Sequence, residues 1–495
     1  MSENSQRGLG VTAARGVFWV GGGQVFRQLV GLTTAIILAR LLAPEDFGLI
    51  AMAYVFIALA QLFADFGIGA AIIQSKDTDP RVISSAFWAN IVVGIALAIM
   101  TAAAAPAIAG FYDDERLLYM TLALSLTLLL SGAVAVPRAV LYRDMRFNRA
   151  IQAQMVGSLA GGLVAVTLAW NGFSVWSLVW QPICGSGISF VLTFAFTGWR
   201  PIRTFSWRHI RHLTSFSFDV LGADLLDYAR QNSDKLIIGK FLGSTALGYY
   251  NLAFQLMLYP LTYVAGVIAK VLFPTLSFLQ KERARLQQAC LKATAAVALI
   301  TFPMMVGLFL VADDFVLVVF GEKWAPMRPV LQILCLIGML QSVGTVAGTI
   351  YLSTGRTRTM FHLALVSAPV TVAALVVGLP WGIVGVAFAY AVATIVLLYV
   401  NLWFALRIIR LRLRDYHAAL LRPLIASSAM AAVVWFVQSI AENAIGANRM
   451  ARLMLCVAAG IVSYVLAILV FNRAQLAELR RLVTASLKHE REAEK

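Results

Sequence analysis

The chain has 495 residues, of which 60% are apolar and only 13% are charged, and its formal net charge at pH 7 is +16. A soluble domain of this composition would expose large apolar surfaces to water, so a membrane protein is expected instead. The basic residues fall in short segments between apolar runs, which indicates attraction to anionic lipid headgroups and argues against nucleic acid as a partner.

Apolar runs of about 20 residues, long enough to cross ~30 Å of hydrocarbon, predict about 14 membrane-spanning helices. In chain order they are expected at 16–38, 48–73, 84–109, 117–137, 151–170, 174–197, 216–240, 248–275, 290–311, 329–352, 360–379, 381–405, 422–441 and 450–471. When the chain is threaded from a cytoplasmic N-terminus, most of its 40 Lys and Arg residues fall in cytoplasmic segments, while the outer segments carry acidic residues. This asymmetry predicts that both termini are cytoplasmic.

One segment near the N-terminus recurs 200 residues later. Residues 36–50 read IILARLLAPEDFGLI, residues 236–250 read LIIGKFLGSTALGYY, and the two align without a gap. The identical pairs are Ile37/Ile237, Leu42/Leu242, Gly48/Gly248 and Ala53/Ala253. Six spans, an even number, separate the two copies. The halves are therefore expected to be parallel repeats, related by a pseudo-twofold axis along the membrane normal.

The duplication divides the chain into two predicted six-helix lobes, residues 1–199 and 216–405, joined by a basic cytoplasmic linker at 200–215. Residues 406–471 hold two additional spans without a counterpart in the first half. A charged cytoplasmic tail at 472–495 has the spacing of a short amphipathic helix on the inner membrane surface. The expected fold class is an all-α polytopic membrane protein.

Span seven carries more charge than an isolated membrane helix can hold. Its ionisable residues are Asp219, Asp224, Asp227, Arg230, Asp234 and Lys235. Exposure of four of these charges to lipid would cost on the order of 10 kcal/mol. Residues from 224 onward, with Tyr228 and Gln231, occupy about half of the helix circumference, so this face is expected to meet water or protein. A second interpretation of these charges is that Arg230 pairs with Asp227 and Asp234, each one turn away on the same helix, so that the charges neutralise one another.

Span one has a matching polar face. It holds Gln24, Arg27 and Gln28, and the 200-residue offset pairs Arg27 with Asp227. We expect spans one and seven to line a shared central cavity, with Arg27 facing the Asp227 region near mid-membrane. Arg27 is the strongest candidate because it has no acidic neighbour on its own helix and because its planar guanidinium suits phosphate oxygens.

Catalytic and metal-binding motifs are missing from the sequence. No GxxxxGK[ST], HExxH or GxSxG pattern occurs. No predicted loop exceeds roughly 20 residues, which is shorter than an independently folding domain. The four Cys residues lack CxxC spacing and are expected to be small buried apolar residues. We expect no catalytic residue, no metal site and no cofactor.

Four patterns spread over nearly the whole chain resemble those of a known family. They are ARLLAPEDFGLIAMA, LFADFGIGAAIIQ, SDKLIIGKFLGSTALGYYNLA and VFGEKWAPMRPVLQIL. With them the sequence resembles the polysaccharide-exporter branch of the multidrug/oligosaccharidyl-lipid/polysaccharide flippase superfamily, close to the bacterial O-antigen and colanic-acid-type exporters.

This resemblance implies a flippase in the bacterial cytoplasmic (inner) membrane that carries a polyprenyl-pyrophosphate-linked oligosaccharide from the inner to the outer leaflet by alternating access. Its implied partners are the lipid-linked substrate, membrane lipids, a polysaccharide polymerase and glycosyltransferases. Substrate-binding candidates are Arg27, Gln24, Gln28, Arg230 and Lys235. Ion-coupling or cavity-lining candidates are Asp224, Asp227, Asp234, Gln231 and Tyr228. Three carboxylates on span seven depart from the family's commonly cationic cavity and keep ion coupling open.

Three other functions stay open. A cation-coupled exporter of drug-like molecules, as in the multidrug branch, would favour an aromatic and acidic cavity, which span seven does not exclude. A membrane glycosyltransferase or polymerase would be supported by paired carboxylates near a long soluble segment, and the sequence shows neither. A non-transporting scaffold would tolerate the loss of Arg27.

Overall fold

The structure is a computed structural model that describes residues 3–64, 80–204, 218–445 and 448–471, with side chains at 19–64, 80–204, 225, 228–443 and 448–470. Within these ranges the chain is helical and contains no β-strand, so the expected all-α fold class is confirmed. It forms two compact units that divide between Gly248 and Tyr249. The tail and most of the basic linker lie outside the described residues.

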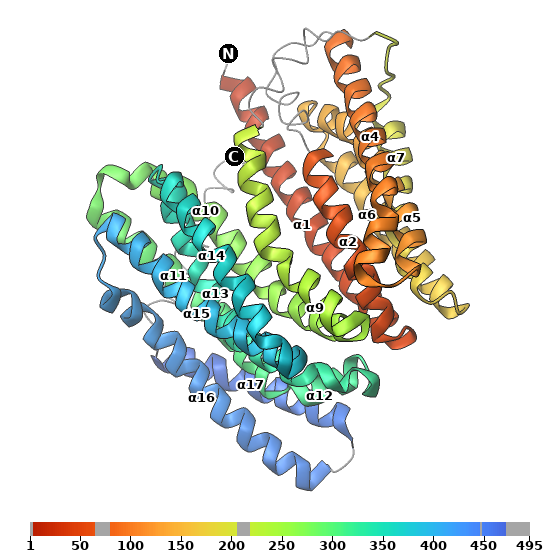
Figure 1. Cartoon of the computed structure of the whole chain (residues 1–495). Coiled ribbons are helices and arrows are strands. Elements are labelled where there is room, and N and C mark those ends of the chain that lie inside the picture. Colours follow the sequence, from red (N-terminus) through yellow and green to blue (C-terminus); the bar gives the residue numbers. More distant parts are fainter. Residues whose placement is uncertain (1–2, 65–79, 205–217, 446–447, 472–495) are drawn as a thin grey trace. The chain divides into compact units, whose positions relative to one another are not determined.

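The first unit is a bundle of long helices that follow the expected spans (Figure 1). Its helices are α1 (Glu3–Leu41), α2 (Pro44–Ala64), α4 (Pro80–Tyr112), α5 (Arg116–Arg143), α6 (Phe147–Trp170), α7 (Val175–Thr197) and the first part of α9 (Phe218–Pro260). Each of the six spans expected before residue 199 overlaps one helix. Helix α6 packs along both α1 and α7, and α5 packs along α4. The polar face of α1 therefore has α6 as a neighbour.

Helix α9 covers the expected span 216–240 and the first part of the span 248–275, with a sharp break between them at Gly243. The backbone there has φ 85° and ψ 175°, a region that is essentially restricted to glycine. We call residues 218–242 the first arm of α9 and residues 244–260 its second arm. In the first copy of the repeat, the equivalent Ala43 lies in the turn between α1 and α2. The duplication thus includes the position of the helix break.

The second unit forms another helical bundle. It continues from α9 with a π-helical turn (Leu261–Ala265), α10 (Gly266–Phe278), η2 (Leu279–Lys281), α11 (Arg283–Leu310), α12 (Ala312–Val319), η3 (Glu322–Met327), α13 (Arg328–Ser353), α14 (Thr357–Gly378), η4 (Leu379–Trp381), α15 (Gly382–Ile409), α16 (Leu413–Ile445) and α17 (Arg449–Phe471). Its main core lies between α10, α11, α13 and α15, where Phe302, Tyr351 and Leu402 are buried. Burial of these large side chains holds the four helices together.

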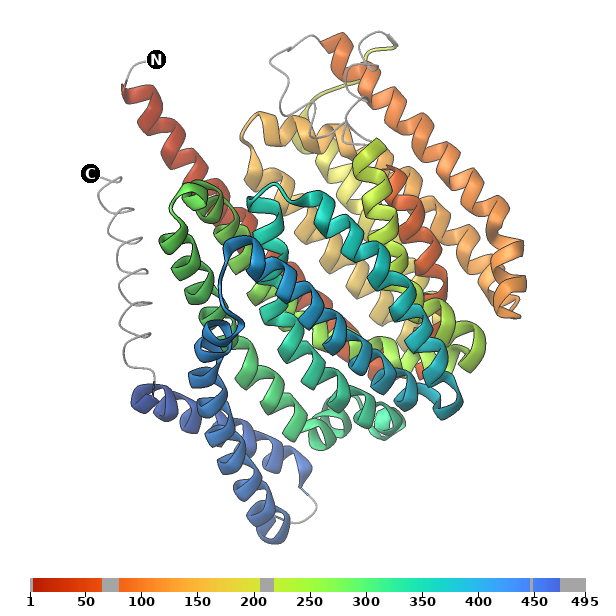
Figure 2. The ribbon, with the colours of Figure 1, turned by 60° about the vertical axis from the view of Figure 1, so that its left-hand side comes forward.

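The last two helices form a hairpin that packs on α11 (Figure 2). The Tyr464 hydroxyl of α17 donates a hydrogen bond of 2.5 Å to the carbonyl oxygen of Leu299 in α11. Near the start of α17, Arg452 forms a two-pronged ion pair with the buried carboxylate of Asp314 in α12. These contacts attach the additional spans to the second unit.

Eleven helical stretches of the described residues are long and apolar enough to cross a membrane. Two of them, Tyr228–Lys281 and Thr357–Ile409, contain internal breaks, so each holds two expected spans. Large apolar side chains on the outer faces are exposed, among them Trp435, Phe436 and Ile461. The chain is therefore a polytopic membrane protein. The number of 14 spans and the lobe boundaries remain predictions.

Candidate functional site

Helix α1 lies close against α6 because each helix has a glycine at the contact. A Cβ atom added at Gly23 would overlap the side chain of Ile151, and one added at Gly162 would lie 2.6 Å from the hydroxyl oxygen of Thr34. In both contacts the residue of α6 lies the same number of positions after the residue of α1. The two helices therefore run in the same direction. Arg27, one turn after Gly23, is thereby brought to α6.

Arg27 is held by two side-chain amides. Its Nη1 donates to Gln154 Oε1 of α6 at 2.5 Å, and its Nη2 donates to Gln24 Oε1 one turn earlier on α1. The Nε2 of Gln154 donates in turn to the hydroxyl of Tyr142 on α5 at 3.5 Å. These contacts link three helices of the first unit. They give polar partners to a half-buried charge that would cost about 2.5–3.5 kcal/mol near the centre of a bilayer.

The structure brings two of the span-one candidates into direct contact, Gln24 and Arg27, while Gln28 follows on the same helix and is half-buried. The sequence candidates did not include Gln154 or Tyr142. A glutamine inside the apolar segment 151–170 was the available signal. Its partner could not be inferred, because the contact joins residues 127 positions apart.

The candidates on the first arm of α9 lie in different surroundings. Asp234 is only 4% exposed, and its Oδ1 accepts the backbone N–H of Lys235 at 2.7 Å. The Nζ of Lys235 donates to Asn232 Oδ1 at 2.9 Å. Arg230 is half-buried and Gln231 is exposed. The polar face of this arm therefore borders protein at Asp234 and is open at Gln231.

Tyr228 attaches the first arm of α9 to α2, because its hydroxyl donates to the backbone carbonyl of Val55. The side chains of Asp224 and Asp227 lie outside the described residues. That Arg27 faces the Asp227 region across a shared cavity therefore remains a prediction.

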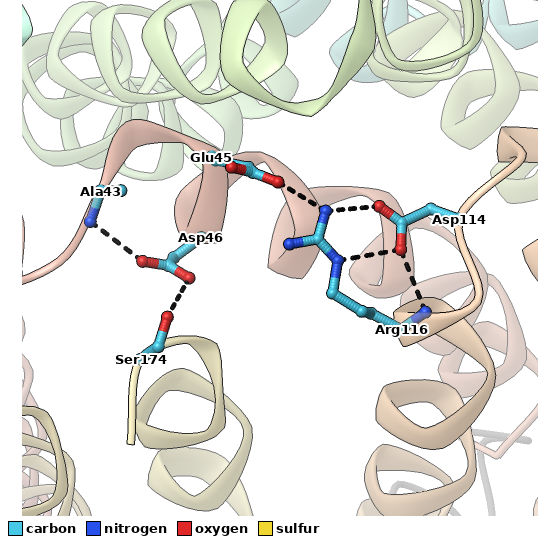
Figure 3. A network of polar contacts seen from close by, with 6 residues as sticks. All are labelled: Ala43, Glu45, Asp46, Asp114, Arg116 and Ser174. Atoms are coloured by element: carbon cyan, nitrogen blue, oxygen red, sulfur yellow. Dashed lines mark hydrogen bonds and ion pairs between the residues drawn. The ribbon is translucent and has the colours of Figure 1, made fainter. Parts of the chain in front are cut away.

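A polar network surrounds the turn where α1 ends and α2 begins (Figure 3). The carboxylate of Asp46 accepts the backbone N–H of Ala43 at 2.9 Å and the hydroxyl of Ser174 at 2.6 Å. Asp46 lies in the first turn of α2 and is buried. Its carboxylate therefore accepts hydrogen bonds from one backbone N–H and one side-chain hydroxyl. It also interacts favourably with the dipole of α2.

The same turn contacts α5 through Arg116 (Figure 3). This guanidinium lies 2.5 Å from Glu45 and 2.7 Å from Asp114. The hydrogen bond from Arg116 holds the pKa of the Asp114 carboxyl below its ordinary value, and burial opposes part of this effect. The repeated motif is thus tied to α5 and α7 at this end of the unit.

The candidate residues carry both kinds of charge. The Arg27 guanidinium and the neighbouring amides can donate to an anionic headgroup, while Asp234 supplies a buried carboxylate. Among the described residues, no group of three His, Cys, Asp or Glu side chains could hold a metal ion. Three of the four cysteines are buried and Cys184 is half-buried; all four are free thiols.

Known proteins with related sequences are named as biosynthesis or transport proteins of bacterial polysaccharides. Residues 37–329, more than half of the chain, match the family described as "Polysaccharide biosynthesis protein". The chain is 28% identical to the teichuronic acid biosynthesis protein TuaB of Bacillus subtilis (strain 168), over 82% of this chain and 84% of that one. It is also 28% identical to the succinoglycan biosynthesis transport protein ExoT of Rhizobium meliloti (strain 1021), with 91% and 92% covered. The lipopolysaccharide biosynthesis protein WzxC of Escherichia coli (strain K12) is 28% identical, with 74% and 75% covered.

Two solved structures share the fold. The lipid II flippase MurJ, in an inward closed conformation, has a TM-score of 0.74 and 16% sequence identity, and the match covers 93% of this chain and all of MurJ. An inward-facing multidrug resistance transporter of the MATE family has a TM-score of 0.63 and 16% identity, with 77% and 94% covered. At these identities the likeness concerns the fold alone.

Proposed function

Because the chain belongs to the family of polysaccharide biosynthesis proteins, we propose that it is a flippase. It moves a polyprenyl-pyrophosphate-linked oligosaccharide from the inner to the outer leaflet of the bacterial cytoplasmic membrane by alternating access, and it breaks no bond. The observation that carries the proposal is the orientation of Arg27 by Gln24 and Gln154. A guanidinium fixed in this way can bind two phosphate oxygens at once.

Two groups of residues have separate roles in this proposal. The headgroup binds to Arg27, Gln24, Gln28, Arg230 and Lys235. The passage is lined, or a coupling cation bound, by Asp224, Asp227, Asp234, Gln231 and Tyr228. Asp234 is a candidate for the coupling role because it is a buried carboxylate, and buried charges in proteins are paired or coordinate cations.

In the proposed orientation both termini are cytoplasmic. The turn between α5 and α6 supports it with Arg143, Arg146 and Arg149, whereas the turn between α4 and α5 carries Asp113 and Asp114. The substrate must be assembled before it is flipped, and the flipped repeat must then be consumed. Glycosyltransferases and a polysaccharide polymerase are therefore the expected partners.

A second candidate function is cation-coupled export of drug-like molecules. The acidic character of α9, with Asp234 buried, favours it, and the multidrug transporter with TM-score 0.63 has the same fold. This function would need an acidic site, whereas the flippase would need the cationic site at Arg27.

The test is translocation of a fluorescent lipid-linked oligosaccharide in vesicles containing the purified protein. Loss of charge-assisted hydrogen bonds predicts that Arg27→Ala lowers the rate roughly 10- to 100-fold while the protein still folds and inserts. Arg149→Ala is the matched control, because this exposed arginine donates only to the carbonyl of Phe196 at the end of α7 among its described contacts. An unchanged rate with Arg27→Ala would refute the role of Arg27. A wild-type protein that moves organic cations but no glycan lipid would favour the second candidate.

A further inference from the structure

The two copies of the repeated segment touch each other through equivalent residues. A Cβ atom added at Gly48 would overlap the carbonyl oxygen of Ser244, and one added at Gly248 would overlap the carbonyl oxygen of Pro44. Since Gly48 aligns with Gly248 and Pro44 aligns with Ser244, the contact is reciprocal, as in an interface between two identical partners. Only glycine allows the two backbones to approach this closely.

An ion pair extends this contact from the first arm of α9 to α4. The Nζ of Lys240 lies 2.6 Å from Asp113 Oδ2 in the turn after α4, and 5.6 Å from the ring centroid of Phe111. The side chain of Asp113 is 78% exposed and that of Lys240 is 30% exposed. Water and salt weaken a pair this exposed, so it can break and form again.

The packing beneath this pair leaves one polar group unsatisfied. Tyr112 is 7% exposed, and the backbone of Gly239 lies against its ring. The hydroxyl of Tyr112 has no hydrogen-bond partner among the described residues. A buried hydroxyl without a hydrogen-bond partner is unfavourable. The backbone of Gly239 therefore packs closely here, but the Tyr112 hydroxyl adds no hydrogen bond to the contact.

We infer that the ion pair of Asp113 and Lys240 is a latch, which holds the first arm of α9 against α2 and α4 and opens when the substrate leaves, while the glycine contact fixes the second arm. The inference rests on the proposed function and orientation, which put the latch at the outer side of the membrane. The break at Gly243 lies between Lys240 of the latch and Ser244 of the glycine contact. The first arm can therefore turn at an existing break without unwinding a helix.

Thiol labelling from outside the cell tests the latch. Met52, which is 2% exposed and lies beside Gly239, is replaced by Cys in a chain whose four native cysteines are changed to Ser. A membrane-impermeant maleimide should label this position slowly. Asp113→Lys should raise the labelling rate by roughly fivefold or more, as expected for a shifted two-state equilibrium. Adding Lys240→Asp should restore the slow rate, because the ion pair forms again with its charges exchanged.

Two controls accompany the measurement. Glu282→Lys reverses the charge of a different exposed ion pair, with Arg285, and should leave the labelling rate at position 52 unchanged. A Cys at the exposed position Glu115 should react equally fast in every variant. The latch would be overturned if Asp113→Lys labelled position 52 no faster than Glu282→Lys does. It would also be overturned if adding Lys240→Asp did not restore the slow rate. Labelling requires no glycan, so a failed translocation assay would reject the proposed substrate and leave the labelling result intact.

Discussion

At the scale of single residues, Gln154 controls the orientation of Arg27. Its Oε1 accepts from the guanidinium, while its Nε2 donates to Tyr142. Replacement by Glu would set a carboxylate against Arg27 and compete with phosphate for the same donors. We expect Gln154→Glu to weaken binding of a pyrophosphate lipid roughly 10-fold or more, whereas Gln154→Met should weaken it less. Titration of the detergent-solubilised protein with the lipid measures both, and equal affinities would contradict this role.

Gly48 is a second residue whose replacement has a definite cost. A Cβ atom there would overlap the backbone of Ser244, which cannot rotate away as a side chain would. Gly48→Ala should therefore destabilise the protein by about 1–3 kcal/mol, the range typical of overpacking. Gly110→Ala is the matched control, because a Cβ atom at Gly110 has open space around it and alanine favours a helix. Thermal unfolding in detergent should show opposite shifts for the two variants.

The carboxylate of Asp114 makes part of the stability pH-dependent. Its pKa is lowered in the folded protein, chiefly by the hydrogen bond from Arg116. Its stabilising contribution is therefore present above its ordinary pKa and is lost as the pH falls through the lower, folded value. Asp114→Asn keeps a hydrogen-bond acceptor at the start of α5 but removes the charge. We expect a slightly lower unfolding temperature than wild type at pH 7, with the difference shrinking as the pH falls below about 4.

At the scale of elements, a buried ion pair helps to anchor the hairpin of α16 and α17 to α12. The side chain of Asp314 is 4% exposed and that of Arg452 is 16% exposed. Arg452→Met leaves a buried carboxylate without its main partner and should cost about 3–5 kcal/mol. The double variant with Asp314→Leu should recover most of this loss, since it removes both charges.

The neighbouring ion pair supplies a control for this prediction. Arg449 lies 3.6 Å from Glu322, and both side chains are largely exposed. Arg449→Met should cost no more than about 1 kcal/mol. Equal losses of unfolding free energy for Arg449→Met and Arg452→Met would contradict the assignment of the buried pair as the anchor.

At the scale of the whole molecule, the helices could be predicted because apolar runs of bilayer length leave few alternatives to a spanning helix. The break in α9 falls in the gap between the expected spans 216–240 and 248–275, and position 243 aligns with the turn at Ala43. The family resemblance drawn from four motifs agrees with the match over residues 37–329.

Contacts between distant segments could not be predicted in the same way. Hydropathy places Gln154 within a span, but it does not say that Arg27 is its partner. The acceptor for Tyr228 is the backbone carbonyl of Val55, which has no sequence signature at all. Equally, the alignment of Gly48 with Gly248 shows that both are glycines, but only the packed backbones show the reason.

The exchanged contacts of the two glycines bear on how this chain arose. A patch that complements itself is what a symmetric dimer of half-length chains would require, so the contact within this chain has the form of a subunit interface. In such a dimer one mutation alters both sides at once. In a single chain each side can vary alone: the pairs Pro44/Ser244 and Ala43/Gly243 differ, while the two glycines are the same.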